Sequence, residues 1–167
     1  MAASPVIAWF ADIGLEDRPH VGGKGGSLGE LQRAGIAVPP GFVIKTGAFE
    51  RFIAALERKA PLRSRIEALG SDDLSATTAR CDETRARIEA EPLPAEVLDE
   101  LTSAYSALCG PSGGGQSPVA VRSSATTEDA ADASFAGLQD TYLWVTDLNQ
   151  TVQRVRSCWR VCIRWNP

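Results

Sequence analysis

The sequence has few of the residues that build metal centres and disulfide frameworks. Its 167 residues include one histidine and four cysteines, with no Cys-x-x-Cys pair. Because no histidine stands beside a cysteine, neither a zinc site nor a disulfide framework is predicted. We expect reduced and mostly buried thiols instead. The cysteines are Cys81, Cys109, Cys158 and Cys162.

Long apolar runs and an excess of basic residues are also missing. No apolar run approaches the length of a membrane span, and residues 1–10 lack the basic start and long apolar region of a signal peptide. The net charge of −4 and the pI near 5.1 argue against nucleic acid or an anionic membrane as the main partner. With 44% apolar residues, the composition predicts a cytoplasmic protein, and the length predicts one domain.

The stretch from 119 to 145 is the most informative one that the sequence does contain. Two short apolar strands flank a segment built mostly of small and hydroxylated residues. The first strand delivers Arg122, whose planar fork of donors suits phosphate, to a run of hydroxyls that begins at Ser123. Gly137 lets the backbone approach a ligand before the second strand starts at Thr141. The alternative is an ordinary hairpin with a long polar turn, in which Arg122 pairs with Glu128 or Asp129.

A glycine cluster near the N-terminus gives a second anion signal. Residues 21–31 read Val-Gly-Gly-Lys-Gly-Gly-Ser-Leu-Gly-Glu-Leu and lead into a helical spacing of apolar residues that Gly35 stops. Glycines at a helix start leave amide groups unshielded, and the helix dipole favours an anion there. Lys24 adds a full positive charge. The spacing is that of neither a P-loop nor a dinucleotide fingerprint, so the alternative is a tight turn that needs glycine for steric reasons.

Three ordered motifs together resemble one family. They are the glycine segment 21–31, the segment 35–43 (Gly-Ile-Ala-Val-Pro-Pro-Gly-Phe-Val), and 119–125 (Val-Ala-Val-Arg-Ser-Ser-Ala) continuing through 133–142 (Ala-Ser-Phe-Ala-Gly-Leu-Gln-Asp-Thr-Tyr). The sequence resembles the N-terminal nucleotide-binding region of phosphoenolpyruvate synthase and pyruvate phosphate dikinase, which rifampin phosphotransferases share. The resemblance covers most of the chain and weakens through 57–117 and after Trp159.

The resemblance implies a fold, a cofactor and a set of site residues. The fold is the N-terminal part of an ATP-grasp domain, an α/β (α+β) arrangement with a mixed sheet flanked by helices. The cofactor is ATP, with Mg²⁺ expected for the family although no ligand for it can be assigned here. Lys24 and Arg122 are the implied catalytic residues. The implied ATP contacts are Gly22, Gly23, Lys24, Arg122, Ser123, Ser134, Gly137, Gln139 and Thr141.

The resemblance also implies that other parts of the enzyme are needed. Relatives of this type add a second ATP-grasp half and a phosphohistidine domain, and His20 is expected to be a loop residue rather than the phosphorylated histidine. We therefore expect the ATP-binding portion of an ATP-dependent phosphotransferase, from a truncated or split enzyme and inactive alone. The remainder could be a separate partner chain. The alternatives are a non-catalytic nucleotide-binding remnant or interaction module, or a fragment of a rifampin-type phosphotransferase.

Periodicity divides this single partial domain, residues 1–167, into four segments. Residues 1–56 hold two expected strands, Val6 to Phe10 and Phe42 to Lys45, and a helix after Thr46. In 57–110, a solvated surface helix is expected within 62–91, and Pro94 opens a helix that Gly110 stops. Residues 111–118 are a flexible connector. Residues 119–167 hold the Arg122 segment, a strand and a C-terminal helix.

The C-terminal helix carries an apolar stripe. Asp147 and Gln150 are the expected N-terminal cap. The stripe of Leu148, Val152, Val155 and Trp159 is either left uncovered for a missing part of the enzyme or packed within this chain. An uncovered stripe would promote self-association.

Overall fold

The chain folds into helices arranged around two antiparallel pairs of strands. The structure is a computed structural model that describes residues 4–62, 64, 74–110, 118–126 and 140–161. β1 (Ile7–Trp9) pairs with β2 (Phe42–Ile44), and β3 (Val119–Arg122) pairs with β4 (Thr141–Val145). The helices are α1 (Arg18–Arg33), α2 (Thr46–Lys59), α4 (Leu74–Ala90), α5 (Ala95–Cys109) and α6 (Leu148–Val161). The expected mixture of helix and strand is confirmed.

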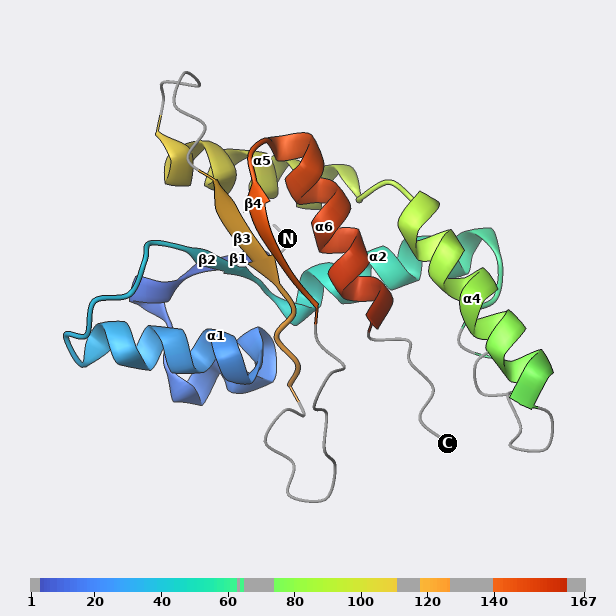
Figure 1. Ribbon diagram of the computed structural model, residues 1–167, viewed down its shortest axis with the longest axis horizontal. Coiled ribbons are helices and arrows are strands. Elements are labelled where there is room, and N and C mark those ends of the chain that lie inside the picture. The colour runs from blue at the N-terminus through green and yellow to red at the C-terminus, as the bar shows by residue number, and fades with distance from the viewer. Residues whose placement is uncertain (1–3, 63, 65–73, 111–117, 127–139, 162–167) are drawn as a thin grey trace.

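The β3–β4 pair lies between the N-terminal helix and the helices of the C-terminal half. Figure 1 shows α1 beside one end of this pair, with α6 next to its strands and α4 beyond α6. β3 alternates half-buried and exposed side chains, with Val121 against the core and Arg122 exposed. Because successive side chains of a strand point to opposite faces, burial of Val121 turns Arg122 outward. The half-buried strand expected before Arg122 is confirmed.

A single apolar core joins α2, α4, α5 and α6. Phe52 is fully buried, and its ring centroid lies 5.0 Å from that of Trp159. The other core members are Val6, Ala48, Ile53, Leu56, Leu62, Ile88, Leu93, Val97, Leu101 and Val155. The α2 members recur at 48, 52, 53 and 56, which is the spacing of one helical face. The helix expected after Thr46 is confirmed, as is the helix after Pro94, which ends at Gly110 with a positive φ of 80°.

The C-terminal helix α6 closes this core. Its first turn is capped as expected, because Asp147 accepts a 2.7 Å hydrogen bond from the backbone amide of Gln150. Val155 and Trp159 are buried, while Leu148 and Val152 pack against the core. Of the two alternatives that the sequence left open for the stripe, packing within this chain is the one observed, because α6 packs on α2, α5 and the strands.

The surface helix expected between 62 and 91 is α4, and most of its described residues are exposed, but one of its faces is not solvated. One face of α4 is buried against α6, since Ile88 is inaccessible and Cys81 is nearly so. Thr77 and Thr84 complete this face at helical spacing. The mixture of threonine with cysteine and isoleucine hides the stripe from a search for strongly apolar residues. Threonine methyl groups nonetheless fill space at a helix contact.

Two further details concern cysteine and histidine. Cys81 and Cys158 are buried and Cys109 is half-buried, and all three are reduced, as expected; Cys162 lies outside the described residues.

His20 is not a loop residue, because it is exposed in the first turn of α1. Within the described residues, no helix is long and apolar enough to cross a membrane.

Candidate functional site

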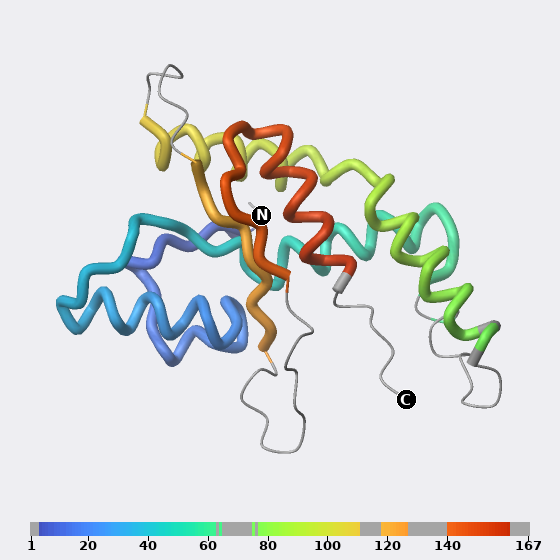
Figure 2. Tube along the Cα trace, in the orientation of Figure 1, coloured from blue at the N-terminus to red at the C-terminus, as the bar shows by residue number. Residues whose placement is uncertain are grey.

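The two segments that the sequence predicts to bind an anion meet at the first turns of α1. The backbone amide of Gly23 donates to the carbonyl oxygen of Ala125 at 2.9 Å. Figure 2 shows the chain beyond β3 passing beside this end of α1. Residues about a hundred positions apart in sequence are thus fixed side by side by a backbone hydrogen bond.

A break in α1 makes this meeting possible. Gly22 has φ 76° and ψ 169°, so the helix is interrupted there and starts again with the following residues. A positive φ is strained for residues with a side chain, and glycine adopts it readily. A Cβ at Gly22 would also lie 2.3 Å from Oγ of Ser124, which is well inside van der Waals contact. The break therefore needs glycine for both its backbone angle and its packing.

Other glycines of the cluster serve close packing too. A Cβ at Gly29 would lie 2.3 Å from the carbonyl oxygen of Ile13, and one at Gly26 would lie 2.9 Å from that of Gly14. The steric reason for glycine, which the sequence left open as the alternative, is thus observed here. This steric role of the glycines does not exclude an anion-binding role for Lys24, which stands among them.

The amides of Gly23 and Gly25 are bonded within the protein. Gly23 donates to Ala125, as described, and Gly25 donates to Oγ of Ser124 at 3.2 Å. The sequence predicts that amides of this segment bind an anion. In the structure, these two amides instead form hydrogen bonds that attach α1 to the end of β3. The charge at this junction therefore comes from side chains.

Lys24 and Arg122 supply that charge. Partial burial lowers the pKa of Lys24 below its ordinary value, and the positive charge of Arg122 lowers it further. Such an effect requires the two cations to lie close enough to repel each other. No ion pair joins Arg122 to a carboxylate among the residues that the structure describes. Two neighbouring positive charges are an arrangement that a phosphate group stabilises.

The end of the β3–β4 pair brings further polar groups to the junction. Thr141 lies opposite Arg122 in the strand register, and the amide of Ser123 donates to the carbonyl oxygen of Asp140 at 3.1 Å. The hydroxyl oxygen of Ser123 is buried, with no hydrogen-bond partner among the described residues. A buried hydroxyl without a partner is a group that a ligand oxygen could satisfy.

The carboxylate of Asp140 is engaged elsewhere. It accepts a 3.0 Å hydrogen bond from the hydroxyl of Tyr142 and lies 3.8 Å from the guanidinium of Arg160. Burial raises the pKa of Tyr142, and this hydrogen bond to Asp140 raises it further. These contacts direct the nearest described acidic group of the hairpin away from Arg122 and toward α6.

The structure therefore brings together Gly22, Gly23, Lys24, Arg122, Ser123 and Thr141, six of the residues that the sequence predicts for the site. Ser134, Gly137 and Gln139 lie outside the described residues, as do Glu128 and Asp129 of the alternative pairing. One residue has a different place from the one expected. Ser124, which the sequence groups with phosphate-facing hydroxyls, is turned toward α1 instead.

A metal site cannot be assembled from the described residues. Within the ranges 4–62, 74–110, 118–126 and 140–161, no group of three or more histidine, cysteine or acidic side chains could hold a metal ion. The described donor set does not fit magnesium, so no chemical step is assigned through that ion.

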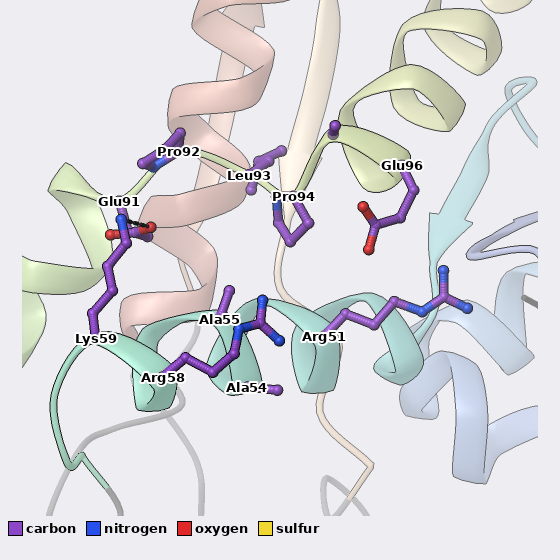
Figure 3. Close-up of a pocket in the computed structure, with 11 residues that line it drawn as sticks. Arg51, Ala54, Ala55, Arg58, Lys59, Glu91, Pro92, Leu93, Pro94 and Glu96 are labelled. Carbon is purple, nitrogen blue, oxygen red and sulfur yellow. Dashed lines mark hydrogen bonds and ion pairs between the residues drawn. The ribbon is translucent and has the colours of Figure 1, made fainter.

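A separate cleft of about 500 Å³ lies between α2 and the connection from α4 to α5. Figure 3 shows Arg51 and Arg58 on α2 facing Glu96 and the proline-rich connection, with Lys59 paired to Glu91 at 2.6 Å. Cations and carboxylates line this cleft together, so its charge is largely compensated. It includes none of the predicted site residues.

Comparison with known proteins agrees with the family that the sequence motifs resemble. Residues 18–164 match the family described as "Pyruvate phosphate dikinase, AMP/ATP-binding domain". The chain is 42% identical over 153 residues to a probable phosphoenolpyruvate synthase of Archaeoglobus fulgidus, covering 92% of this chain and 20% of that protein. It is 39% identical over 152 residues to a probable phosphoenolpyruvate synthase of Methanocaldococcus jannaschii, covering 91% of this chain and 13% of that protein.

A rifampicin phosphotransferase is similar to the same extent. The chain is 40% identical over 155 residues to a rifampicin phosphotransferase of a Streptomyces species, covering 92% of this chain and 17% of that protein. The chain thus spans at most about a quarter of the length of the curated relatives it matches.

Proposed function

Because this chain belongs to the pyruvate phosphate dikinase AMP/ATP-binding domain family, we propose that the junction of α1 and β3 binds the phosphate groups of ATP. One observation carries the proposal: the backbone hydrogen bond from Gly23 to Ala125, 2.9 Å long, sets Lys24 beside the end of β3 where Arg122 stands, and the lowered pKa of Lys24 agrees with this proximity. Bound phosphate would neutralise both cations and relieve their repulsion.

The side chains at the junction have different tasks in this proposal. Lys24 acts as a compact charge on a flexible stem, and Arg122 offers a planar fork that binds two phosphate oxygens at once. The buried hydroxyl of Ser123 is a third donor group. These groups stabilise the negative charge of the transferring phosphoryl group, for which ATP is the donor.

The rest of the predicted site belongs to the proposal as well. Ser134, Gly137 and Gln139 are implied contacts from the segment that follows β3, and Thr141 stands where that segment enters β4. Gly22 and Gly23 contribute by shaping the break in α1. Magnesium is expected to accompany ATP, with ligands supplied from outside the described residues.

We further propose that the chain serves an ATP-dependent phosphotransferase of the phosphoenolpyruvate synthase type. The relatives named above are several times longer than the matched region, so this activity needs parts beyond that region. A surface for contact with those parts is offered by β4, which pairs with β3 alone within the described residues. Its Leu143 and Trp144 are 65% and 77% exposed. The remainder could belong to a separate chain.

The acceptor of the phosphoryl group stays undecided between the two kinds of relative. Identity to the rifampicin phosphotransferase is 40%, against 39% and 42% for the two synthases, so the matched region does not discriminate between pyruvate and an antibiotic. A non-catalytic nucleotide-binding remnant is the second candidate, because the described residues contain no metal cluster. The cytoplasmic location inferred from composition stays a prediction.

Calorimetric titration with ATP tests the binding proposal. Lys24→Ala and Arg122→Ala should each weaken binding by about tenfold or more, the factor expected for losing a hydrogen bond to a charged group. Arg58→Ala and Lys59→Ala are matched controls, because they remove the same charges at the separate cleft and should leave binding unchanged. Absence of any heat at millimolar ATP, or equal losses in the controls, would contradict the proposal.

A turnover assay separates the two candidate functions. The purified chain with ATP, magnesium and pyruvate should show no turnover, since the described residues offer neither metal ligands nor a positioned acceptor. Formation of AMP and phosphoenolpyruvate, or of phosphohistidine at His20, would show that the chain is a complete enzyme. Recovery of turnover on adding the missing portion of a related enzyme would support a split enzyme over a remnant.

A further inference from the structure

Ser124 makes contacts that set it apart from the hydroxyl residue beside it. Its hydroxyl donates to the backbone carbonyl oxygen of Val21 at 3.0 Å and accepts from the amide of Gly25 at 3.2 Å. These two partners lie on opposite sides of the break at Gly22. One hydroxyl therefore bridges the two parts of α1.

We propose that Ser124 is a positioning residue, which locks the break in α1 and so holds Lys24 beside Arg122. The inference deepens the proposed function and rests on it, because it explains how the two phosphate-binding cations keep their places. It assigns Ser124 no contact with ATP.

The position of Lys24 between two fixed amides is the first reason. Gly23 is tied to the carbonyl oxygen of Ala125, and Gly25 is tied to Ser124. The backbone of Lys24 is therefore held on both sides, by Ala125 through Gly23 and by Ser124 through Gly25. A shift of α1 relative to β3 would break both hydrogen bonds, so the two cations move as one unit.

The chemistry of the hydroxyl is the second reason. At the break, Val21 is buried and its carbonyl needs a donor, while the amide of Gly25 needs an acceptor. A serine hydroxyl can donate and accept at the same oxygen, and it is short enough to fit against a glycine. Gly22 meets that requirement, because a Cβ there would lie 2.3 Å from Oγ of Ser124.

The same contacts exclude a direct role in phosphate binding. The single hydroxyl proton of Ser124 is given to Val21, so none is left for a phosphate oxygen. Ser123 differs, because its hydroxyl is buried with no partner among the described residues. The two adjacent serines therefore have different roles. The hydroxyl of Ser123 is available to a ligand, and that of Ser124 holds the two parts of α1 at the junction.

A double-mutant cycle on ATP affinity tests the proposal. Ser124→Ala alone should weaken ATP binding by roughly tenfold. In a Lys24→Ala background it should weaken binding by less than about twofold, because a residue that acts through Lys24 has nothing left to position. Ser103→Ala is the matched control, since it removes an exposed serine hydroxyl of α5 that donates to the carbonyl oxygen of Asp99. Equal losses in both backgrounds would overturn the proposal.

The pKa of Lys24 gives a second readout that does not depend on ATP. The chain has three lysines, Lys24, Lys45 and Lys59, so isotope-labelled methyl groups on the lysine amines give few NMR signals, and Lys24→Arg identifies one of them. In Ser124→Ala the pKa of Lys24 should rise toward its ordinary value, because Lys24 gains water and moves away from Arg122. An unchanged pKa would overturn the positioning role.

Failure of the two proposals can be told apart. If Lys24→Ala and Arg122→Ala leave ATP binding intact, the proposed function fails, while the pKa measurement still decides whether Ser124 positions Lys24. If those variants lose binding and Ser124→Ala does not, only the positioning role fails. Should Ser124→Ala not fold, Ser124→Cys keeps a weaker donor and acceptor of similar size. The same two measurements then apply to Ser124→Cys, and an unchanged ATP affinity together with an unchanged pKa of Lys24 would overturn the positioning role.

Discussion

The junction of α1 with β3 and the core around Phe52 are built on opposite principles. The core joins four helices through fully buried apolar side chains, with the rings of Phe52 and Trp159 in contact. The junction is held by backbone amides, a serine hydroxyl and glycines that permit close approach. It also places two like charges near each other.

This difference separates stability from function. Burial of apolar side chains supplies most of the free energy that keeps such a chain folded. The junction keeps groups whose mutual repulsion a ligand would relieve, and repulsion of this kind lowers the stability of the ligand-free protein. Substitutions in the core should therefore act mainly on unfolding, and substitutions at the junction mainly on ATP binding.

The largest effect on stability is expected in the core. Phe52→Ala should lower the free energy of unfolding by about 3–5 kcal/mol, because Phe52 is fully buried and leaves a cavity. Phe49→Ala is the matched control: Phe49 also touches Trp159, at 5.7 Å between ring centroids, but is only half-buried and should matter less. Denaturant unfolding measures both. Equal losses would show that the core is not centred on Phe52.

The break in α1 is the next most sensitive point. Gly22→Ala and Gly35→Ala both place alanine at a positive φ, 76° and 78°, which costs about 1–3 kcal/mol at each site. At Gly22 the new methyl group also meets Ser124, whereas at Gly35 nothing lies within 4 Å. Gly22→Ala should therefore lose roughly 1–3 kcal/mol more than Gly35→Ala, and it alone should lose ATP affinity. Similar losses in thermal unfolding and titration would contradict a packed junction.

A smaller effect, of opposite sign, is expected from the charge at the junction. Lys24→Met should raise the free energy of unfolding by less than about 1 kcal/mol while abolishing the contribution of Lys24 to ATP binding. Lys59→Met, which breaks the 2.6 Å pair with Glu91, should leave stability unchanged or slightly lower. A loss of stability in Lys24→Met would show that Lys24 is stabilising.

The stability gained in Lys24→Met should depend on pH, because the pKa of Lys24 is lowered in the folded chain. The folded chain binds fewer protons at Lys24 than the unfolded chain does between the lowered value and the ordinary value of 10.5. In that interval the contribution of Lys24 to stability improves as pH rises. The advantage of Lys24→Met should therefore be full at neutral pH and vanish above about pH 10.5, as unfolding in denaturant at several pH values would reveal.

The smallest effect is expected at two exposed side chains of β4. Trp144 has a positive φ of 58° and is 77% exposed, so Trp144→Asn should leave stability within about 0.5 kcal/mol, because asparagine tolerates that backbone better. Leu143→Asn, at 65% exposure with no positive φ, is the control and should lose a little strand propensity. A large loss in Trp144→Asn by thermal unfolding would mean that Trp144 packs within the chain.

Much of the local structure could be predicted because it depends on neighbouring residues. The face of α2, the stop at Gly110 and the cap formed by Asp147 each depend on side chains within a few positions of one another. Where prediction was wrong, distant contacts were responsible. The buried face of α4 was missed because α6 buries threonine beside Cys81 and Ile88, and the state of the α6 stripe stayed open because it depends on α2 and α5, which cover it.

The sequence by itself determined the family and the identity of the two cations, because Lys24 and Arg122 stand in ordered motifs whose residue types are visible without a fold. Only the tertiary structure decided what the neighbouring residues do. The amides of Gly23 and Gly25 and the hydroxyl of Ser124 are taken up by contacts between segments about a hundred residues apart. A sequence names potential donors and acceptors, but only chain packing determines which of them are already paired and which face a ligand.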